Sequence, residues 1–373
     1  MSHPLARIPS IGSSDNLSDL DQRHHQSLSV HRADVEPRFV TPSHSVQEDS
    51  PELLDAKAAS QGLWTTTDDG VRLYYERHGP SDAPHRVLLI AGMNATFEAW
   101  ALQLEALTGA GASRRRSAAA LRLQLLVFDN RGVGFSDAPP FTEAAYNTTR
   151  MAQDALCVAD AVGWSTFVIA AHSLGGMIAQ RVVLRAPTRV RGLLLASSRI
   201  VGGFWQSLPT WTGLYQFVRM RLASTADDEL EQTLHFLFPA EFLSMHCKER
   251  GDSMAPFSYK TNRDWVFDML RRRKGAKTAN GSEGHLFAAR THSLLPLECE
   301  ALREAHASGR TPIVIVTGSE DLVVPPSHSK HAADVLCGGA LTVFDKCGHA
   351  VSIQESDQFN RLIVELCERV FLD

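Results

Sequence analysis

The residues Phe-Val-Ile-Ala-Ala-His-Ser-Leu-Gly-Gly-Met at positions 167–177 decide the fold. They open with an apolar, β-branched run that is typical of a buried strand, and a stretch typical of a helix follows the two glycines. The pattern predicts a sharp turn from strand to helix that holds the hydroxyl of Ser173 clear of the sheet. A serine hydroxyl is a weak nucleophile without a base beside it and donors for the charge it creates. The rest of the chain should therefore supply these groups.

Two later segments supply an acid and a base. An apolar strand pattern that begins at Ile313 ends in a loop that contains Glu320 and Asp321. The last strand-like run of the chain is followed by a loop that carries His349. Catalytic groups of open parallel sheets lie at the carboxyl ends of the strands. We therefore expect Ser173, Asp321 and His349 to meet at one edge of a sheet, with Glu320 as the close competitor for the acid.

Two further motifs precede the serine. The sequence Asp-Asn-Arg-Gly-Val-Gly-Phe-Ser occupies positions 129–136, and Leu-Leu-Ile-Ala-Gly-Met-Asn occupies positions 88–94. Together with the order serine, aspartate, histidine, they resemble the α/β-hydrolase superfamily of the serine-esterase type, over about residues 62–373. The resemblance implies an α/β fold: a mainly parallel eight-stranded sheet with helices on both faces and an inserted helical cap.

The sequence departs from the family pattern at two positions. Ala171 replaces the first glycine of the G-x-S-x-G turn, and Ala91 replaces the usual histidine before Gly92. The turn requires a small residue because strand and helix backbones nearly touch, and alanine is small. The loop at Gly92 has to offer a backbone N–H group, which a change of side chain does not remove.

The resemblance also implies the catalytic roles. His349 is expected to act as the general base for Ser173, and Asp321 to orient the imidazole and stabilise its charged form. The backbone N–H groups of Leu174 and Met93 are expected to hold the oxyanion. Two neighbours in the Met93 loop, Gly92 and Asn94, complete this part of the site, and Asn94 is a candidate for substrate contact.

The function that follows is hydrolysis of a carboxylic ester, small to medium and fairly apolar, through an acyl-enzyme. A thioester, lactone or amide would use the same groups. Cleavage of a carbon–carbon bond beside a ketone, or cofactor-free perhydrolysis, is an alternative on the same three residues. A non-catalytic ligand receptor or scaffold is a second alternative, because a fold does not fix a function. Serine at position 173 argues against the epoxide and halide chemistry of relatives that use aspartate there. No metal and no cofactor are expected.

The pattern divides the chain into three parts. Alternating strand and helix signals place an α/β core at residues 62–199 and 299–373. Between them, residues 200–298 show amphipathic helical stretches and many aromatic residues, which indicates a helical cap; in it, the glycine-flanked stretch 278–284 resembles a loop. Residues 1–61 are rich in Ser, Asp, His and Pro, and they are expected to form a disordered tail.

Composition limits the partners. Hydrophobic residues make up 44% and charged residues 21% of the 373 residues, as in globular enzymes. The net charge of −5 argues against nucleic acid as a partner. No run of 18 apolar residues predicts an integral membrane segment, and no apolar signal core opens the chain, so we expect a cytoplasmic protein. The expected partner is a small apolar ester-like molecule; the sequence leaves the oligomeric state open.

Overall fold

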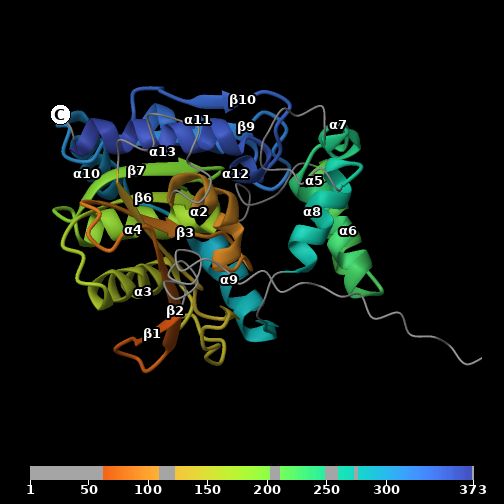
Figure 1. Cartoon of the computed structure of the whole chain (residues 1–373), viewed down its shortest axis with the longest axis horizontal. Helices are drawn as coiled ribbons and strands as arrows, with labels where there is room; N and C mark the ends of the chain where they lie inside the picture. Colours follow the sequence, from red (N-terminus) through yellow and green to blue (C-terminus); the bar gives the residue numbers. More distant parts are fainter. Residues whose placement is uncertain (1–61, 109–121, 202–210, 248–258, 273–275, 372–373) are drawn as a thin grey trace, which may run out of the picture. The chain divides into compact units, whose positions relative to one another are not determined.

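The computed structural model of the chain describes residues 62–108, 122–201, 211–247, 259–272 and 276–371 (Figure 1). The predictions for residues 1–61, and for two aromatic residues of the expected cap, Phe204 and Trp205, lie outside these ranges.

An eight-stranded sheet forms the centre of the described chain. Its strands lie in the order β1 (Leu63–Thr66), β2 (Arg72–His78), β4 (Leu123–Phe128), β3 (His85–Ile90), β6 (Phe167–His172), β7 (Val190–Ala196), β9 (Ile313–Gly318) and β10 (Thr342–Phe344). Strand β2 runs antiparallel to β1 and β4, and all pairs from β4 to β10 are parallel. The predicted mainly parallel sheet is confirmed, with an antiparallel edge.

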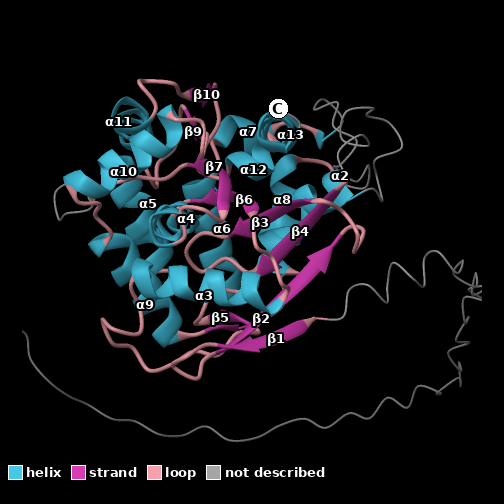
Figure 2. Cartoon of the chain, turned by 90° about the vertical axis from the view of Figure 1, so that its left-hand side faces the viewer, coloured by secondary structure: helices cyan, strands magenta, loops and turns pink. Residues whose placement is uncertain are grey.

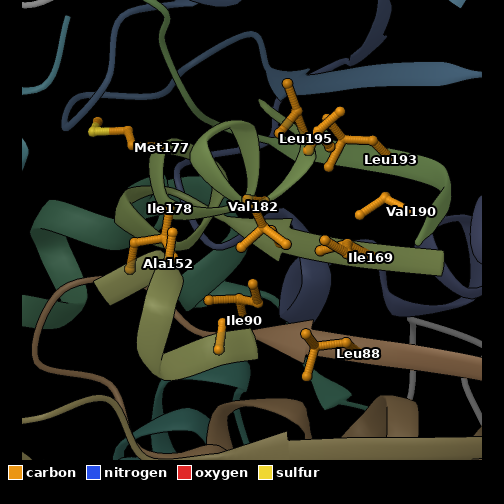
Figure 3. Packing of buried hydrophobic residues seen from close by; sticks show 14 of the residues in the cluster. Leu88, Ile90, Ala152, Ile169, Met177, Ile178, Val182, Val190, Leu193 and Leu195 are labelled. Atoms are coloured by element: carbon orange, nitrogen blue, oxygen red, sulfur yellow. The ribbon is translucent and has the colours of Figure 1, made fainter. Parts of the chain in front are cut away.

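Helices cover both faces of this sheet (Figure 2). One apolar core joins alternate strand residues, such as Leu88 and Ile90, to residues of five helices. These helices are α3 (Thr148–Ala161), α4 (Leu174–Arg185), α9 (Ala279–Thr291), α10 (Pro296–Ala307) and α11 (Pro326–Leu336). Figure 3 shows part of this core, where Ile169 of β6 and Val182 of α4 contribute side chains. A strand buried on both sides needs apolar residues at every position, which explains the continuous runs in the sequence.

The opposite face carries a second apolar core. It contains the intervening strand residues, such as Val87 and Leu89, together with residues of α2 (Ala101–Thr108) and α13 (Ser356–Phe371). Successive side chains of a strand point to opposite faces, so one run of sequence fills both cores. Three short elements complete this part of the chain: η1 (Phe97–Trp100), β5 (Val133–Gly134) and α12 (Val351–Gln354).

The segment expected to be a cap is helical where it is described. It contains α5 (Trp211–Arg221), α6 (Ala226–Leu237), α7 (Ala240–Ser244), α8 (Asn262–Arg271), the two-residue strand β8 (Ala276–Lys277), which pairs with β5, and α9 (Ala279–Thr291). The side chains of Thr225, Thr261 and Thr278 each accept a backbone N–H and so begin α6, α8 and α9. The division into core and cap stays a prediction.

Three aromatic residues of this segment share one apolar cluster. The rings of Phe238 and Phe242 are stacked with centroids 5.3 Å apart, and Trp265 joins them in this cluster. Ala350 and Ile353, which follow the loop of His349, and Leu102 of α2 belong to the same cluster. Helices α6 to α8 therefore share an apolar cluster with α2 and with residues next to His349.

The expectation of a loop at residues 278–284 is wrong. Thr278 accepts the N–H of Gly281 at 2.9 Å, and α9 begins directly after it. A Cβ atom at Gly281 would overlap the backbone of Gly132, and one at Gly284 would overlap the ring of Tyr146. These glycines permit close packing of a helix, and they do not mark a chain that lacks regular structure.

Buried polar contacts fasten the end of α9 to the core. Nδ1 of His292 lies 3.0 Å from the hydroxyl oxygen of Thr148, and its Nε2 lies 3.1 Å from Oε1 of Gln180. An amide oxygen only accepts, so Nε2–H donates to Gln180. Burial lowers the pKa of His292 to about 3 and keeps the ring neutral, so Nδ1 has no proton and accepts from the hydroxyl of Thr148.

This lowered pKa predicts acid destabilisation. The pKa of a histidine in the unfolded chain is about 6.5, so below that value the unfolded state binds a proton that folded His292 does not. Its contribution is complete above pH 6.5 and falls by roughly 1.4 kcal/mol per pH unit below it. Urea unfolding between pH 7 and pH 5 should show a shallower pH dependence in His292→Gln than in the wild type. The control His331→Gln, which changes an exposed histidine, should keep the wild-type slope; equal slopes in all three proteins would contradict the prediction.

Candidate active site

Ser173 occupies a strained turn between β6 and α4. Its backbone has φ 56° and ψ −121°, a conformation that residues other than glycine rarely adopt. Its N–H donates to the carbonyl oxygen of Ala196 at 2.8 Å, and the hydroxyl of Ser198 donates to its carbonyl oxygen at 2.9 Å. Ala196 is the last residue of β7, the neighbouring strand, and Ser198 lies two residues further along the chain. The sheet itself therefore fixes the turn that the sequence predicted.

Glycines let this turn lie against the end of β3. A Cβ atom at Gly175 would overlap the carbonyl oxygen of Ile90, and one at Gly92 would lie 3.1 Å from Cβ of Ser173. Ala171, which replaces the first glycine of the motif, is fully buried in the apolar core of the sheet. The structure therefore accommodates a methyl group at position 171, whereas Gly175 has no room for one.

Asp321 and His349 form a buried pair. Asp321 follows β9, and its Oδ1 accepts the N–H groups of Val323 and Val324, both at 2.9 Å. Nδ1 of His349 lies 2.8 Å from Oδ2 and 3.0 Å from Oδ1 of Asp321. Glu320 is exposed. A carboxylate only accepts, so Nδ1 carries the proton, and Nε2 of His349 is left with its lone pair.

The turn at Ser173 and the loop of His349 lie side by side. Nε2 of His172 lies 2.8 Å from the carbonyl oxygen of His349, and the two imidazole rings have centroids 4.7 Å apart. A carbonyl only accepts, so Nε2–H of His172 donates this bond. His172 thus links the residue before the serine to the loop of the predicted base.

The loop of His349 is also held by helix α6. The N–H of His349 donates to the carbonyl oxygen of Leu237, the last residue of α6, at 2.9 Å. A Cβ atom at Gly348 would overlap this carbonyl group, so glycine is required for the approach. Gln354 accepts the N–H of Gly348 at 3.0 Å and donates to the carbonyl of Lys346 at 2.7 Å. These three hydrogen bonds fix this short loop.

The predicted oxyanion groups are the N–H groups of Leu174 and Met93. Leu174 follows Ser173 as the first residue of α4, where an N–H group has no partner within the helix. Met93 packs partly against the apolar core, and a Cβ atom at Gly92 before it would lie 3.1 Å from Cβ of Ser173. Asn94 has φ 56°, and its N–H donates to Nδ1 of His285 at 3.0 Å.

Two buried charged residues support these loops. The carboxylate of Asp129 accepts the N–H of Phe97 at 2.8 Å and that of Phe135 at 2.9 Å. Burial raises the pKa of Asp129 to about 6, although the two N–H donors favour the charged form and lower the pKa. Arg131 is buried and forms ion pairs with Asp154 and Asp69. Neither charge is left without compensation, as burial requires.

The contacts of His285 were not predicted from the sequence. The residue lies in α9, is fully buried, and bonds Asn94 through Nδ1 and the carbonyl oxygen of Arg131 through Nε2 at 2.9 Å. A signal was present, because His285, Ala288 and His292 have the spacing of one helix face. Two glycines in the same stretch obscured the helix, and nothing in the sequence relates it to a loop 191 residues away.

The described residues contain no group of three His, Cys, Asp or Glu side chains that could hold a metal ion. In the same part of the chain, no helix combines the length and the hydropathy that crossing a bilayer requires.

The fold agrees with comparisons to known proteins. A family model described as "alpha/beta hydrolase fold" matches residues 85–356, and the chain belongs to this family. The resemblance stated from the sequence is thereby confirmed.

Curated bacterial proteins are similar over most of the chain. Two of them carry the name "Putative carbamate hydrolase RutD". The one from Variovorax paradoxus (strain S110) is 26% identical over 304 residues, which are 80% of this chain and 97% of that protein. The one from Agrobacterium fabrum is 26% identical over 305 residues, which are 79% of this chain and 97% of that protein.

Solved structures show the same fold. A hydrolase from Pseudomonas aeruginosa PA01 has a TM-score of 0.60 and 23% identity, and the match covers 83% of this chain and 98% of that one. The enol-lactonase from Burkholderia xenovorans LB400 has a TM-score of 0.60 and 18% identity, covering 82% and 99%. Family and relatives together support a hydrolase.

The close approach at Gly175 predicts a large cost for a single methyl group. Gly175→Ala should lower the free energy of unfolding by about 2–3 kcal/mol, because the new Cβ overlaps a backbone oxygen that cannot move freely. Gly309→Ala is the control: nothing lies within 4 Å of its Cβ position, and its φ of +73° should cost only about 1 kcal/mol. Urea denaturation measures both. Equal losses would mean that the turn can move away from β3.

Proposed function

We propose that this protein is a serine hydrolase that cleaves a carboxylic ester, or a related acyl compound, through an acyl-enzyme intermediate. The observation that carries the proposal is the buried hydrogen bond between His349 and Asp321, beside the strained turn of Ser173. Imidazole, carboxylate and strained serine come from three different strand ends. Membership of the α/β-hydrolase family supports the same conclusion.

In the proposed mechanism, Nε2 of His349 takes the proton of Ser173 as the serine oxygen attacks the substrate carbonyl. Asp321 holds the tautomer with the proton on Nδ1 and stabilises the imidazolium that forms. The backbone N–H groups of Leu174 and Met93 stabilise the oxyanion. His349 then protonates the leaving group, and a water molecule activated by the same imidazole hydrolyses the acyl-enzyme.

The proposed substrate is a small, fairly apolar molecule with an ester-like carbonyl group. Thioesters, lactones, amides and carbamates present the same carbonyl to the serine, and the name of the RutD proteins points to carbamates. A panel of p-nitrophenyl esters with acyl chains of increasing length, one aryl carbamate, one lactone and one vinylogous diketone would rank these classes. If only the diketone is turned over, carbon–carbon bond cleavage becomes the proposed activity in place of ester hydrolysis.

A fluorophosphonate probe tests the nucleophile. The wild type should be labelled covalently, and Ser173→Ala should lose the label, because the probe reacts only with an activated serine. Ser308→Ala, which changes an exposed serine after α10, should be labelled like the wild type. Intact-protein mass spectrometry reads the adduct. A folded wild type that takes up no probe would contradict catalysis and favour a ligand receptor or scaffold.

The acid is tested by a pair of neighbouring substitutions. Asp321→Asn should lower kcat by about 10³–10⁴-fold, because the amide stabilises the wrong imidazole tautomer. Glu320→Gln should retain the wild-type kcat, because Glu320 is exposed. Steady-state kinetics on the best substrate of the panel measures both. A loss of kcat in Glu320→Gln with normal turnover in Asp321→Asn would reverse the assignment.

A further inference from the structure

We propose that His285 is a positioning residue that holds the oxyanion loop, residues 92–94, in its reactive geometry from helix α9. The inference rests on the proposed function, because the loop matters only if Met93 stabilises an oxyanion. It adds to the three proposed catalytic residues a fourth side chain, which comes from the segment expected to be the cap.

The two hydrogen bonds of His285 fix the protonation of its ring. Nε2 faces the carbonyl oxygen of Arg131 at 2.9 Å, and a carbonyl oxygen only accepts, so Nε2 carries the proton. Nδ1 faces the backbone N–H of Asn94 at 3.0 Å, and an N–H only donates, so Nδ1 has no proton. The neutral ring with the proton on Nε2 is therefore the state that satisfies both contacts.

The environment keeps the ring in this state. His285 is fully buried, and burial lowers its pKa to about 4, although its bond to Arg131 acts in the opposite direction. The ring of Tyr146 lies beside it, with centroids 6.4 Å apart. At neutral pH, Nδ1 is consequently a permanent acceptor for Asn94, and His285 acts as a fixed brace.

The helix that carries His285 is itself fixed to the core. The hydroxyl of Thr278 donates to the carbonyl of Gly132 at 2.9 Å, and Gly281 packs directly on Gly132. Gly132 follows Arg131, whose carbonyl group accepts from His285. The start of α9 and the imidazole of His285 therefore bind the same loop, at Gly132 and Arg131. This fixes the position of the ring that accepts the N–H of Asn94.

The bond matters because Asn94 lies in a conformation that most residues avoid. Its φ of 56° is in the left-handed region, directly after Met93, whose N–H is a proposed oxyanion donor. Gly92, on the other side of Met93, lies so near the turn that a Cβ atom there would be 3.1 Å from Cβ of Ser173. Without the acceptor of His285, the N–H of Asn94 loses its partner, and the peptide groups of the loop become free to turn. Oxyanion donors contribute only while they point at the developing charge.

Two substitutions separate the two bonds of His285. In His285→Asn, the side-chain oxygen reaches approximately the position of Nδ1 and can accept from Asn94, but the shorter side chain does not reach Arg131. In His285→Gln, the amide N–H reaches approximately the position of Nε2 and can donate to Arg131, but the N–H of Asn94 loses its acceptor. Both variants remove the ring and should lose similar stability.

Steady-state kinetics and the rate of fluorophosphonate labelling give the readout. We expect His285→Gln to lower kcat by about 10- to 100-fold with little change in KM, because the substitution weakens a contact to the oxyanion that forms only in the transition state. His285→Asn should recover most of this loss. The control His292→Gln, which changes another buried histidine of the same region, should keep kcat although it loses stability. Equal kcat values in His285→Gln and His285→Asn, or wild-type kcat in His285→Gln, would overturn the inference.

A measurement on the wild type covers the case in which a variant does not fold. Nitrogen-15 NMR of the histidine side chains should show His285 with the proton on Nε2 and no titration between pH 8 and pH 5.5. A proton on Nδ1 would overturn the brace, since Nδ1 could not accept from Asn94. If the folded wild type takes up no fluorophosphonate, the proposed function fails and the inference fails with it. If the wild type reacts and His285→Gln reacts equally fast, only the inference fails.

Discussion

The backbone strain at Ser173 is the constraint on which the rest of the site depends. A non-glycine residue in such a conformation costs about 1–3 kcal/mol and persists only where the surroundings fix it. Ala196 and Ser198 hold the two sides of the turn, and the absence of a side chain at Gly175 lets α4 begin against the end of β3. The hydrogen bonds to the end of β7 thus hold Ser173, which is buried, in this sharp turn.

Three buried polar side chains near this turn, those of Asp321, His285 and Arg131, are paired by groups from distant segments of the chain. Asp321 receives two backbone N–H groups and the imidazole of His349, so its burial leaves no carboxylate oxygen uncompensated. His285 receives one N–H and donates one, and Arg131 meets two carboxylates. Such networks are specific in geometry, because any displaced member leaves a buried polar group without its partner.

Most of the sheet and the proposed catalytic residues were predictable from the sequence, because both follow from local patterns. Strand β6 is a continuous apolar run, and Asp321 and His349 come directly after such runs. The role of His285 was not predictable, because its partner is a backbone group of the β3 loop. The start of α9 was misjudged for the same reason: Gly281 is explained by contact with Gly132, and no local propensity reports that contact.

The bond between Leu237 and His349 has a mechanical consequence. A lid that swings outward as one body around a hinge would carry the end of α6 with it, and it would pull on the backbone of His349 at every opening. The end of α6 is therefore tied to the loop of His349, and a swing of this kind would displace the proposed base unless the bond to Leu237 broke.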